Sequence, residues 1–195
     1  MIEDTGGSTL AGSFPGPRIV VIGVTGSGKT TLAENLSRIF SLPHVELDAL
    51  HWLPGWVQQE REMFRQSVDQ ALAGPAWVVD GNYAKARDII WARATTLVWL
   101  NYPLPVTLWQ LTGRTLRRMA TREPLWNGNQ ESFRNTFMSK DSILLWALTS
   151  YSRLNRSFPA ELALPENAHL QVIRLRSRAA TARWLAEIQK QISQK

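Results

Sequence analysis

The chain has 195 residues, of which 44% are hydrophobic and 19% are charged, so it can bury a sizeable core and is not a disordered protein. It contains no cysteine, which excludes disulfides, thiolate zinc sites and a cysteine nucleophile, and we expect a cytoplasmic protein. The sequence lacks a secretory signal and any apolar run near the ~20 residues of a membrane span, so we expect no membrane partner. The net charge of +6 favours acidic partners, such as nucleotides or nucleic acid.

The order of the predicted elements indicates an α/β fold. We expect a flexible tail over 1–17 and one domain over 18–195. Short apolar runs predict strands, and apolar residues at helical spacing predict the helices between them. The predicted strands are 18–23, 44–47, 76–79, 95–100 and 170–175, and the predicted helices lie near 32–40, 64–72, 85–94, 108–119 and 181–192. This alternation predicts a five-stranded parallel sheet with helices on both faces. An irregular helical stretch, about 123–165, predicts a helical lid inserted into the domain.

A glycine-rich turn separates the first predicted strand from the first predicted helix. Its sequence, GVTGSGKT, fits the pattern G-x-x-x-x-G-K-[ST] of a phosphate-binding loop. Glycines let the backbone curl so that N–H groups point at phosphate oxygens, and the helix N-terminus adds partial positive charge. Lys29 is expected to reach the β- and γ-phosphates, and the Thr30 hydroxyl is expected to hold Mg²⁺. A P-loop NTPase fold with ATP and Mg²⁺ as cofactors follows, and the expected nucleotide-binding residues of the loop are Gly23, Thr25, Gly26, Ser27, Gly28, Lys29, Thr30 and Thr31.

Two carboxylates at predicted strand ends narrow the chemistry. The sequence has no N-K-x-D motif for guanine and no transporter signature, which leaves small-molecule kinases. Asp80 is expected to organise Mg²⁺ through water, and Asp48 to orient or deprotonate an acceptor hydroxyl or to contact Mg²⁺. The structural alternatives are that Asp80 is only a turn residue and that Asp48 is only a helix cap. His51, Trp52 and Trp56 either wall an acceptor pocket or pack helices, and the histidines lack the spacing of a zinc site.

A pair of arginines completes the predicted catalytic set of Lys29, Asp48, Arg114 and Arg118. Arg114 and Arg118 are four residues apart in a predicted helix and therefore project from one side of it. Guanidinium groups pair with phosphates and stack on bases, which suits a nucleotide held during transfer. A solvated basic face is the alternative. A lid over 123–165 would exclude water, which otherwise accepts the phosphoryl group, and packing of its helices is the alternative.

Together these motifs resemble the adenylate-kinase-related proteins often labelled DNA topology modulation proteins, or FlaR-like proteins. The resemblance rests on the glycine loop, LDALHWLPGW, WVVDGNY, the arginine helix and LWNGNQESF…KDSILLW, in that order over 18–176. It implies a P-loop kinase core. VVDGNY is similar to the D-G-F-P-R segment of adenylate kinases, but Asn82 and Tyr83 depart from it, and the arginine that would grip a nucleoside monophosphate is missing. RTLRR (114–118) is similar to the lid-base R-x-x-x-R, which implies that Arg114 stacks on adenine, that Arg118 contacts phosphates and that Arg176 borders the adenine.

Two functions from different classes fit these residues. In the leading hypothesis, ATP·Mg²⁺ binds the glycine loop, and a nucleotide, nucleoside or similar small acceptor held near Asp48 attacks the γ-phosphorus. The alternative, which the family label suggests, is an ATP-binding regulator that contacts DNA and influences its topology, although no DNA-binding module is recognisable. The sequence does not name the acceptor or distinguish a monomer from a homodimer.

Overall fold

The computed structural model describes residues 2–4, 14–121, 125–129 and 143–194. A six-stranded sheet lies at its centre, with the strand order β1-β8-β7-β2-β6-β3 and every neighbouring pair parallel. The five predicted strands are confirmed. The strands are β1 (Ile2–Asp4), β2 (Arg18–Gly23), β3 (His44–Glu46), β6 (Trp77–Asp80), β7 (Thr96–Leu100) and β8 (Gln171–Leu175).

The sixth strand corrects the expectation of a flexible tail over 1–17. β1 pairs with β8 in register, with Ile2 opposite Val172. Nearer the domain, the Phe14 ring packs edge-on against the Phe40 ring at 5.3 Å. No strand could be predicted here, because a three-residue edge strand has no apolar run of its own. It is placed by the unpaired backbone groups that the edge of β8 offers.

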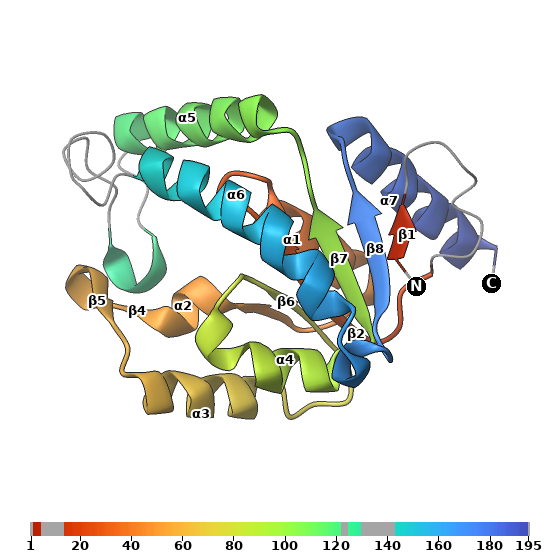
Figure 1. The fold of residues 1–195 in the computed structure, drawn as a ribbon. Coiled ribbons are helices and arrows are strands. Elements are labelled where there is room, and N and C mark those ends of the chain that lie inside the picture. The colour runs from red at the N-terminus through yellow and green to blue at the C-terminus, as the bar shows by residue number, and fades with distance from the viewer. Residues whose placement is uncertain (1, 5–13, 122–124, 130–142, 195) are drawn as a thin grey trace.

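Helices cover both faces of the sheet, as the alternation of strands and helices predicts. Figure 1 shows α6 crossing one face, with α4 and α3 on the same side. The opposite face is covered by α1 and α7, whose apolar side chains form a second cluster with the strands. The main helices are α1 (Lys29–Phe40), α3 (Arg61–Ala71), α4 (Arg87–Arg93), α5 (Leu104–Thr121), α6 (Ile143–Leu162) and α7 (Arg178–Ser193).

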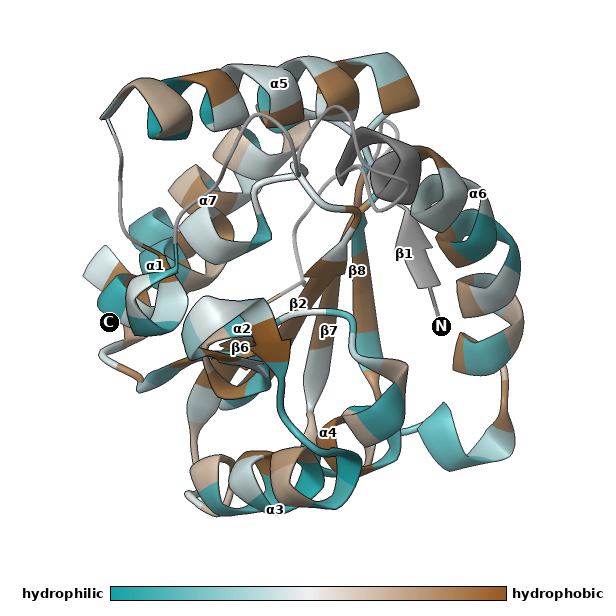
Figure 2. Cartoon of the chain, turned by 90° about the vertical axis from the view of Figure 1, so that its left-hand side faces the viewer, coloured by the Kyte–Doolittle hydropathy of each residue, from teal (hydrophilic) through white to brown (hydrophobic). Residues whose placement is uncertain are grey.

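Burial explains why these segments form strands and helices. Strands β6 and β7 are buried at every residue, because helices cover both of their faces. The helices are buried on one side only: α3 buries Phe64 and Val68, four residues apart, and its other residues are exposed or half-buried. Figure 2 shows this contrast, with largely hydrophobic strands and helices that carry one hydrophobic and one hydrophilic side.

Part of the predicted lid belongs to the core instead. Leu154, Phe158 and Leu162 of α6 are buried in the same cluster as the strands, so 154–162 is a covering helix and not a lid. Their spacing of four residues is the signal of one buried helix face. Residues 130–142 of the predicted lid lie outside the described residues.

The connection between β3 and α3 is built from very short elements. They are α2 (Leu47–His51), β4 (Trp52–Leu53), η1 (Pro54–Trp56) and β5 (Val57–Gln58), and the strands β4 and β5 form an antiparallel hairpin. Three further single turns are η2 (Ala84–Ala86), η3 (Trp126–Gly128) and η5 (Pro165–Asn167). None of the helices in the described ranges is long and apolar enough to cross a membrane.

The strand order defines where a ligand can bind. β2 lies between β6 and β7, and the chain leaves β2 for β3 on one side and later returns to β7 on the other. Ligands of open α/β sheets bind at the carboxyl ends of the strands where the order reverses. Here that place is the end of β2, where the glycine turn begins.

Candidate active site

The glycine turn curls over the carboxyl end of β2 and packs against α5. Gly26 and Gly28 have φ angles of 85° and 89°, in the left-handed region that favours glycine. A Cβ on Gly26 would lie 2.7 Å from the Cβ of Leu111, so α5 approaches the loop too closely for any side chain there. A Cβ on Gly28 would meet no described atom within 4 Å. The backbone at Gly28 is therefore open to a ligand.

Lys29 begins α1 and folds back over this loop. Its Nζ lies 3.3 Å from the carbonyl oxygen of Val24. Burial lowers the pKa of this ammonium group, the carboxylates of Asp48 and Asp80 raise it, and the guanidinium of Arg114 lowers it. The net pKa of Lys29 is lowered. The predicted catalytic lysine, both predicted carboxylates and one predicted arginine therefore share one space at the carboxyl edge of the sheet.

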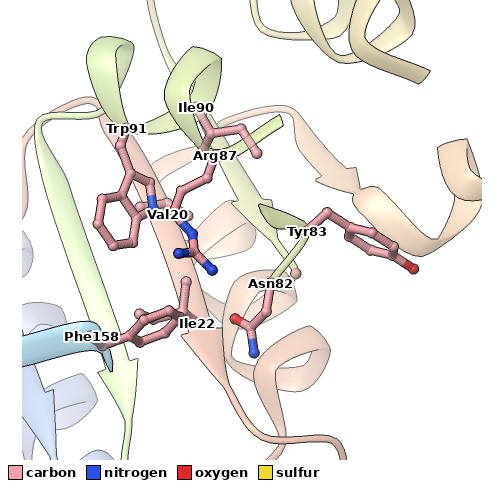
Figure 3. Close-up of a pocket in the computed structure, with 9 residues that line it drawn as sticks. Val20, Ile22, Asn82, Tyr83, Arg87, Ile90, Trp91 and Phe158 are labelled. Atoms are coloured by element: carbon pink, nitrogen blue, oxygen red, sulfur yellow. The ribbon is translucent and has the colours of Figure 1, made fainter. Parts of the chain in front are cut away.

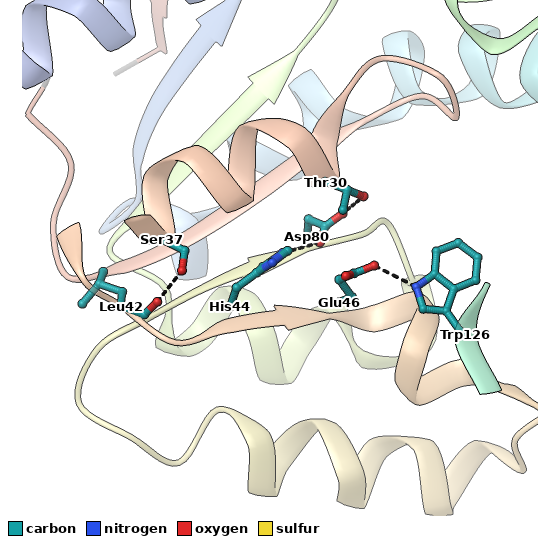
Figure 4. A network of polar contacts seen from close by, with 7 residues as sticks. All are labelled: Thr30, Ser37, Leu42, His44, Glu46, Asp80 and Trp126. Carbon is teal, nitrogen blue, oxygen red and sulfur yellow. Dashed lines mark hydrogen bonds and ion pairs between the residues drawn. The ribbon is translucent and has the colours of Figure 1, made fainter. Parts of the chain in front are cut away.

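Asp80 is the last residue of β6 and is held by two partners, as Figure 4 shows. Its Oδ2 accepts a hydrogen bond from the Thr30 hydroxyl at 2.8 Å, and its Oδ1 lies 2.8 Å from Nε2 of His44. Burial lowers the pKa of His44, but the bond to Asp80 and nearby carboxylates outweigh it, so that pKa is raised. Sequence reasoning missed His44, although its place one strand over from Asp80 follows from the sheet order.

The pair Thr30 and Asp80 fits magnesium better than zinc. Within the described ranges, no group of three His, Cys, Asp or Glu side chains could hold a metal ion. A hydroxyl and a carboxylate are oxygen ligands, and Mg²⁺ prefers a few such ligands and keeps several waters.

The strand β3 ends at Glu46, one residue before the end of the predicted strand. Asp48 therefore lies in the first turn of α2. The residue at the cap position of α2 is Glu46, so Asp48 is not the helix cap. Its Oδ1 accepts a hydrogen bond from the Tyr83 hydroxyl. Burial raises the pKa of Asp48, whereas the bond from Tyr83 and the charges of Lys29 and Arg114 lower it, and the net pKa is raised.

Asn82 joins the end of β6 to the first glycine of the loop. Its Oδ1 accepts from the Gly23 amide at 3.2 Å, and its Nδ2 donates to the Gly23 carbonyl. The side chain thus bonds the backbone of Gly23 in both directions and fixes the start of the loop. In the sequence, Asn82 and Tyr83 were visible only as departures from the adenylate kinase pattern. Their position after a buried strand is the signal that could have identified them.

A cavity of about 10 Å³ lies behind Asn82, between β2, α4 and α6 (Figure 3). The guanidinium of Arg87 lies over the rings of Trp91 and Phe158, at 5.3 and 4.9 Å from their centroids, and is paired with Glu161. This space is enough for about one water molecule and too small for a nucleotide. The candidate site is therefore the edge above the strands.

Aromatic rings cluster around the acceptor-side segment. The centroid of the His51 ring lies 4.7 Å from that of Trp52 and 4.6 Å from that of Tyr83. The ring centroids of Trp52 and Trp56 are 5.5 Å apart. Burial, with a smaller contribution from the charge of Lys85, lowers the pKa of His51 to about 4. His51 is therefore neutral at pH 7. Trp52 and Trp56 are only half-buried, which is compatible both with packing and with a pocket wall.

The predicted arginines are spread over a wider area. The charge of Arg114 lowers the pKa of Lys29 and of Asp48, so Arg114 lies within electrostatic range of both groups. Arg118 is half-buried one turn further along α5, and Arg176 is exposed in the loop after β8. The nucleotide contacts of Arg118 and Arg176 stay predictions.

Comparison with known proteins agrees with this fold. No family model and no curated protein matches the sequence. A gluconokinase from Sinorhizobium meliloti is similar in structure, with a TM-score of 0.50 and 19% identity over 92% of this chain and 97% of the other. A shikimate kinase from Acinetobacter baumannii is similar with a TM-score of 0.52 and 19% identity over 92% and 94% of the two chains. With the five predicted parallel strands and the glycine turn in place, the chain has the fold of the P-loop NTPases.

Proposed function

We propose that this protein transfers the γ-phosphoryl group of ATP to a hydroxyl group of a small acceptor. The observation that carries the proposal is the meeting of Lys29, the Thr30–Asp80 pair and the half-buried Asp48 carboxylate at one sheet edge. Phosphate binding alone needs only the loop. A carboxylate beside the loop that can accept the proton of a hydroxyl group is the feature that favours a transferase.

The donor side would hold the triphosphate through the loop. The open backbone at Gly28 leaves room for phosphate oxygens, and Lys29 supplies a positive charge. Thr30 and Asp80 fit Mg²⁺, which would neutralise charge on the phosphates when bound. The bond between Asp80 and His44 holds the carboxylate in place for this role.

Asp48 would act on the acceptor. The acceptor hydroxyl oxygen forms a bond to the γ-phosphorus, the bond from that phosphorus to the bridging oxygen of ADP breaks, and the hydroxyl proton passes to the Asp48 carboxylate. The raised pKa makes this carboxylate a stronger base than an exposed one. Tyr83 donates to its Oδ1 and thereby fixes its orientation.

Arg114 suits the phosphates better than the adenine. The resemblance implies stacking on the base, but the charge of this side chain acts on Lys29 and Asp48, the groups that would meet the γ-phosphate. A guanidinium at that place stabilises the negative charge of the transferred group. We therefore assign it to the transfer step.

The candidate acceptors are small molecules that carry a hydroxyl group. The two similar structures are a gluconokinase and a shikimate kinase, and both names describe kinases of small hydroxylated molecules. At 19% identity this is an analogy of fold, which guides the choice of candidates only. Gluconate, shikimate, nucleosides and nucleoside monophosphates therefore form the first panel.

The test is an acceptor screen with Mg²⁺ and ATP, followed by mass spectrometry of the products. We expect a phosphorylated product with one acceptor class, and its loss in Lys29→Ala. Lys190→Ala is the matched control, because Lys190 is exposed on α7. No product with any acceptor, together with DNA binding that weakens steeply with salt, would instead favour the DNA-contacting regulator.

A further inference from the structure

Residues Leu125–Asn129, here called the 125–129 turn, lie far from the acceptor side in sequence but next to it in space. The turn follows α5 along the chain and lies beside the β4–β5 hairpin (Figure 1). The amide of Leu125 donates to the Asn129 carbonyl at 2.6 Å, and that of Gly128 donates to the Leu125 carbonyl at 3.0 Å. These bonds make the turn a compact unit.

The side chain of Asn129 bridges the tip of the hairpin. Its Oδ1 accepts from the Trp56 amide at 2.8 Å, and its Nδ2 donates to the Leu53 carbonyl at 3.0 Å. In a β-turn the carbonyl of the first residue commonly bonds the amide of the fourth. Leu53 and Trp56 are the first and fourth residues of the hairpin turn, and the side-chain amide of Asn129 bonds to both of these backbone groups. Asn129 is only 4% exposed, so this bridge is shielded from water.

The hairpin depends on such support. Trp56 has a φ of 60°, an uncommon conformation for a bulky side chain, which persists only when its surroundings impose it. The two strands, β4 and β5, are two residues each, and an isolated hairpin of that length is not stable in water. The 125–129 turn therefore helps to determine the shape of this segment.

The same turn holds both ends of α2. The Trp126 indole donates to Oε2 of Glu46 at 2.7 Å, just before α2 (Figure 4), and Nδ2 of Asn127 donates to the Trp52 carbonyl at 2.5 Å, just after it. Asp48 lies between these two anchors. A shift of the turn would therefore move the Asp48 carboxylate.

We propose that Trp126, Asn127 and Asn129 are positioning residues that hold α2, and through it Asp48, in place for phosphoryl transfer. The inference rests on the proposed function of Asp48 as the base. The turn follows α5, whose Leu111 packs against Gly26 of the phosphate loop. One stretch of chain thus borders both the donor side and the acceptor side.

The first test is hydrogen exchange of the substrate-free protein, with Asn129→Ala against Asn167→Ala. The control also loses a bond from a side-chain amide to the backbone, here from the half-buried Asn167 to the Glu161 carbonyl at 2.8 Å, at a place outside the acceptor side. In Asn129→Ala we expect exchange over 46–58 to become about tenfold faster, as loss of hydrogen bonds worth about 1.4 kcal/mol implies. Unchanged protection of 46–58 would overturn the proposal.

The second test separates positioning from stability. With the acceptor found in the screen, Asn129→Ala should lower kcat by about tenfold to a hundredfold, while calorimetry gives an unchanged Kd for ATP·Mg²⁺. Equal loss in the control, or an equal loss of ATP affinity, would show a merely structural role. If the wild type phosphorylates no acceptor, the proposed function fails, and the exchange data still decide whether the turn holds α2.

Trp126→Phe covers the case in which Asn129→Ala does not fold. It retains a ring against Trp56 and removes only the donor to Glu46. We expect a faster exchange confined to 46–51 and a kcat lower by about threefold, because one hydrogen bond is lost. Exchange like that of the wild type would again contradict the proposal.

Discussion

The phosphate side and the acceptor side of the site are built in different ways. The phosphate side is one continuous stretch, Gly23–Thr30, in which we propose that the backbone itself forms the binding surface. The acceptor side brings Asp48 from α2 together with Tyr83 from the end of β6 and the 125–129 turn. One is specified locally, and the other depends on contacts between segments that are distant in sequence.

This difference determines how each side responds to a change. A loop anchored on a central buried strand shifts little when a distant residue is altered. The acceptor side has few buried apolar residues of its own: β4 and β5 include the exposed Leu53 and Val57, and side-chain hydrogen bonds hold them. Such segments belong to the less stable part of a fold. Substitutions should therefore affect the two sides separately.

The largest expected effect is that of Asp48→Asn. Loss of the base should reduce kcat by about 10²- to 10⁴-fold and leave ATP affinity unchanged. The amide oxygen retains an acceptor for the Tyr83 hydroxyl, so the local structure should persist. Asp69→Asn, which changes the same charge in the exposed pair with Arg93, is the control. Weaker ATP binding in Asp48→Asn would break the separation of the two sides.

The same carboxylate predicts an acid limb in the wild type. Asp48 must be deprotonated to accept a proton, and its pKa lies above the ordinary value of 3.8. The rate should therefore fall as the pH decreases through a pKa higher than that of an exposed carboxyl. A pH–rate profile of transfer measures this, and a profile that stays flat down to the ordinary value would exclude Asp48 as the base.

The fold and the phosphate side could be predicted because their signals are local. Apolar runs locate the strands, and the G-x-x-x-x-G-K-[ST] spacing identifies the loop without any knowledge of its neighbours. Asp80 and Asp48 were found from the rule that ligands bind at strand ends. The predicted number of strands was one too low, because β1 forms by pairing with the open edge of β8 and has no strand pattern in its own sequence.

The acceptor side could not be predicted in the same way. Asn127, Gly128 and Asn129 read as an ordinary turn, which is what their backbone forms. The side chains of Asn127 and Asn129 bond a hairpin more than seventy residues away, and Asn129 follows Trp56 by 73 residues. No pattern within one segment carries that information. The pair Asn82 and Gly23, 59 positions apart, is a similar case.

A smaller effect is expected from the buried His51, and it bears on acceptor-side stability. Its pKa is about 4 when folded and near 6.5 when unfolded. Above pH 6.5 both states are neutral; as the pH falls toward 4, the unfolded state takes up a proton that the folded state does not. This should lower the free energy of unfolding by about 2 kcal/mol at pH 5. Urea unfolding at pH 7.5 and at pH 5 measures it.

His51→Phe removes this titration while retaining a ring of similar shape. The variant should therefore lose less stability than the wild type between the two pH values. An identical pH dependence in His51→Phe and in the wild type would mean that the acceptor side does not hold a neutral histidine.

The smallest expected effect is on the phosphate side, where Asn82→Ala removes both bonds to the Gly23 backbone. The start of the loop should become less fixed, and ATP·Mg²⁺ should bind about tenfold more weakly by calorimetry, as loss of about 1.4 kcal/mol implies. The acceptor KM should not change, and Asn35→Ala on the surface of α1 should affect neither quantity. If Asn82→Ala instead raised the acceptor KM at constant ATP affinity, the residue would belong to the acceptor side, and the boundary between the two sides would have to be drawn through β6 rather than beside it.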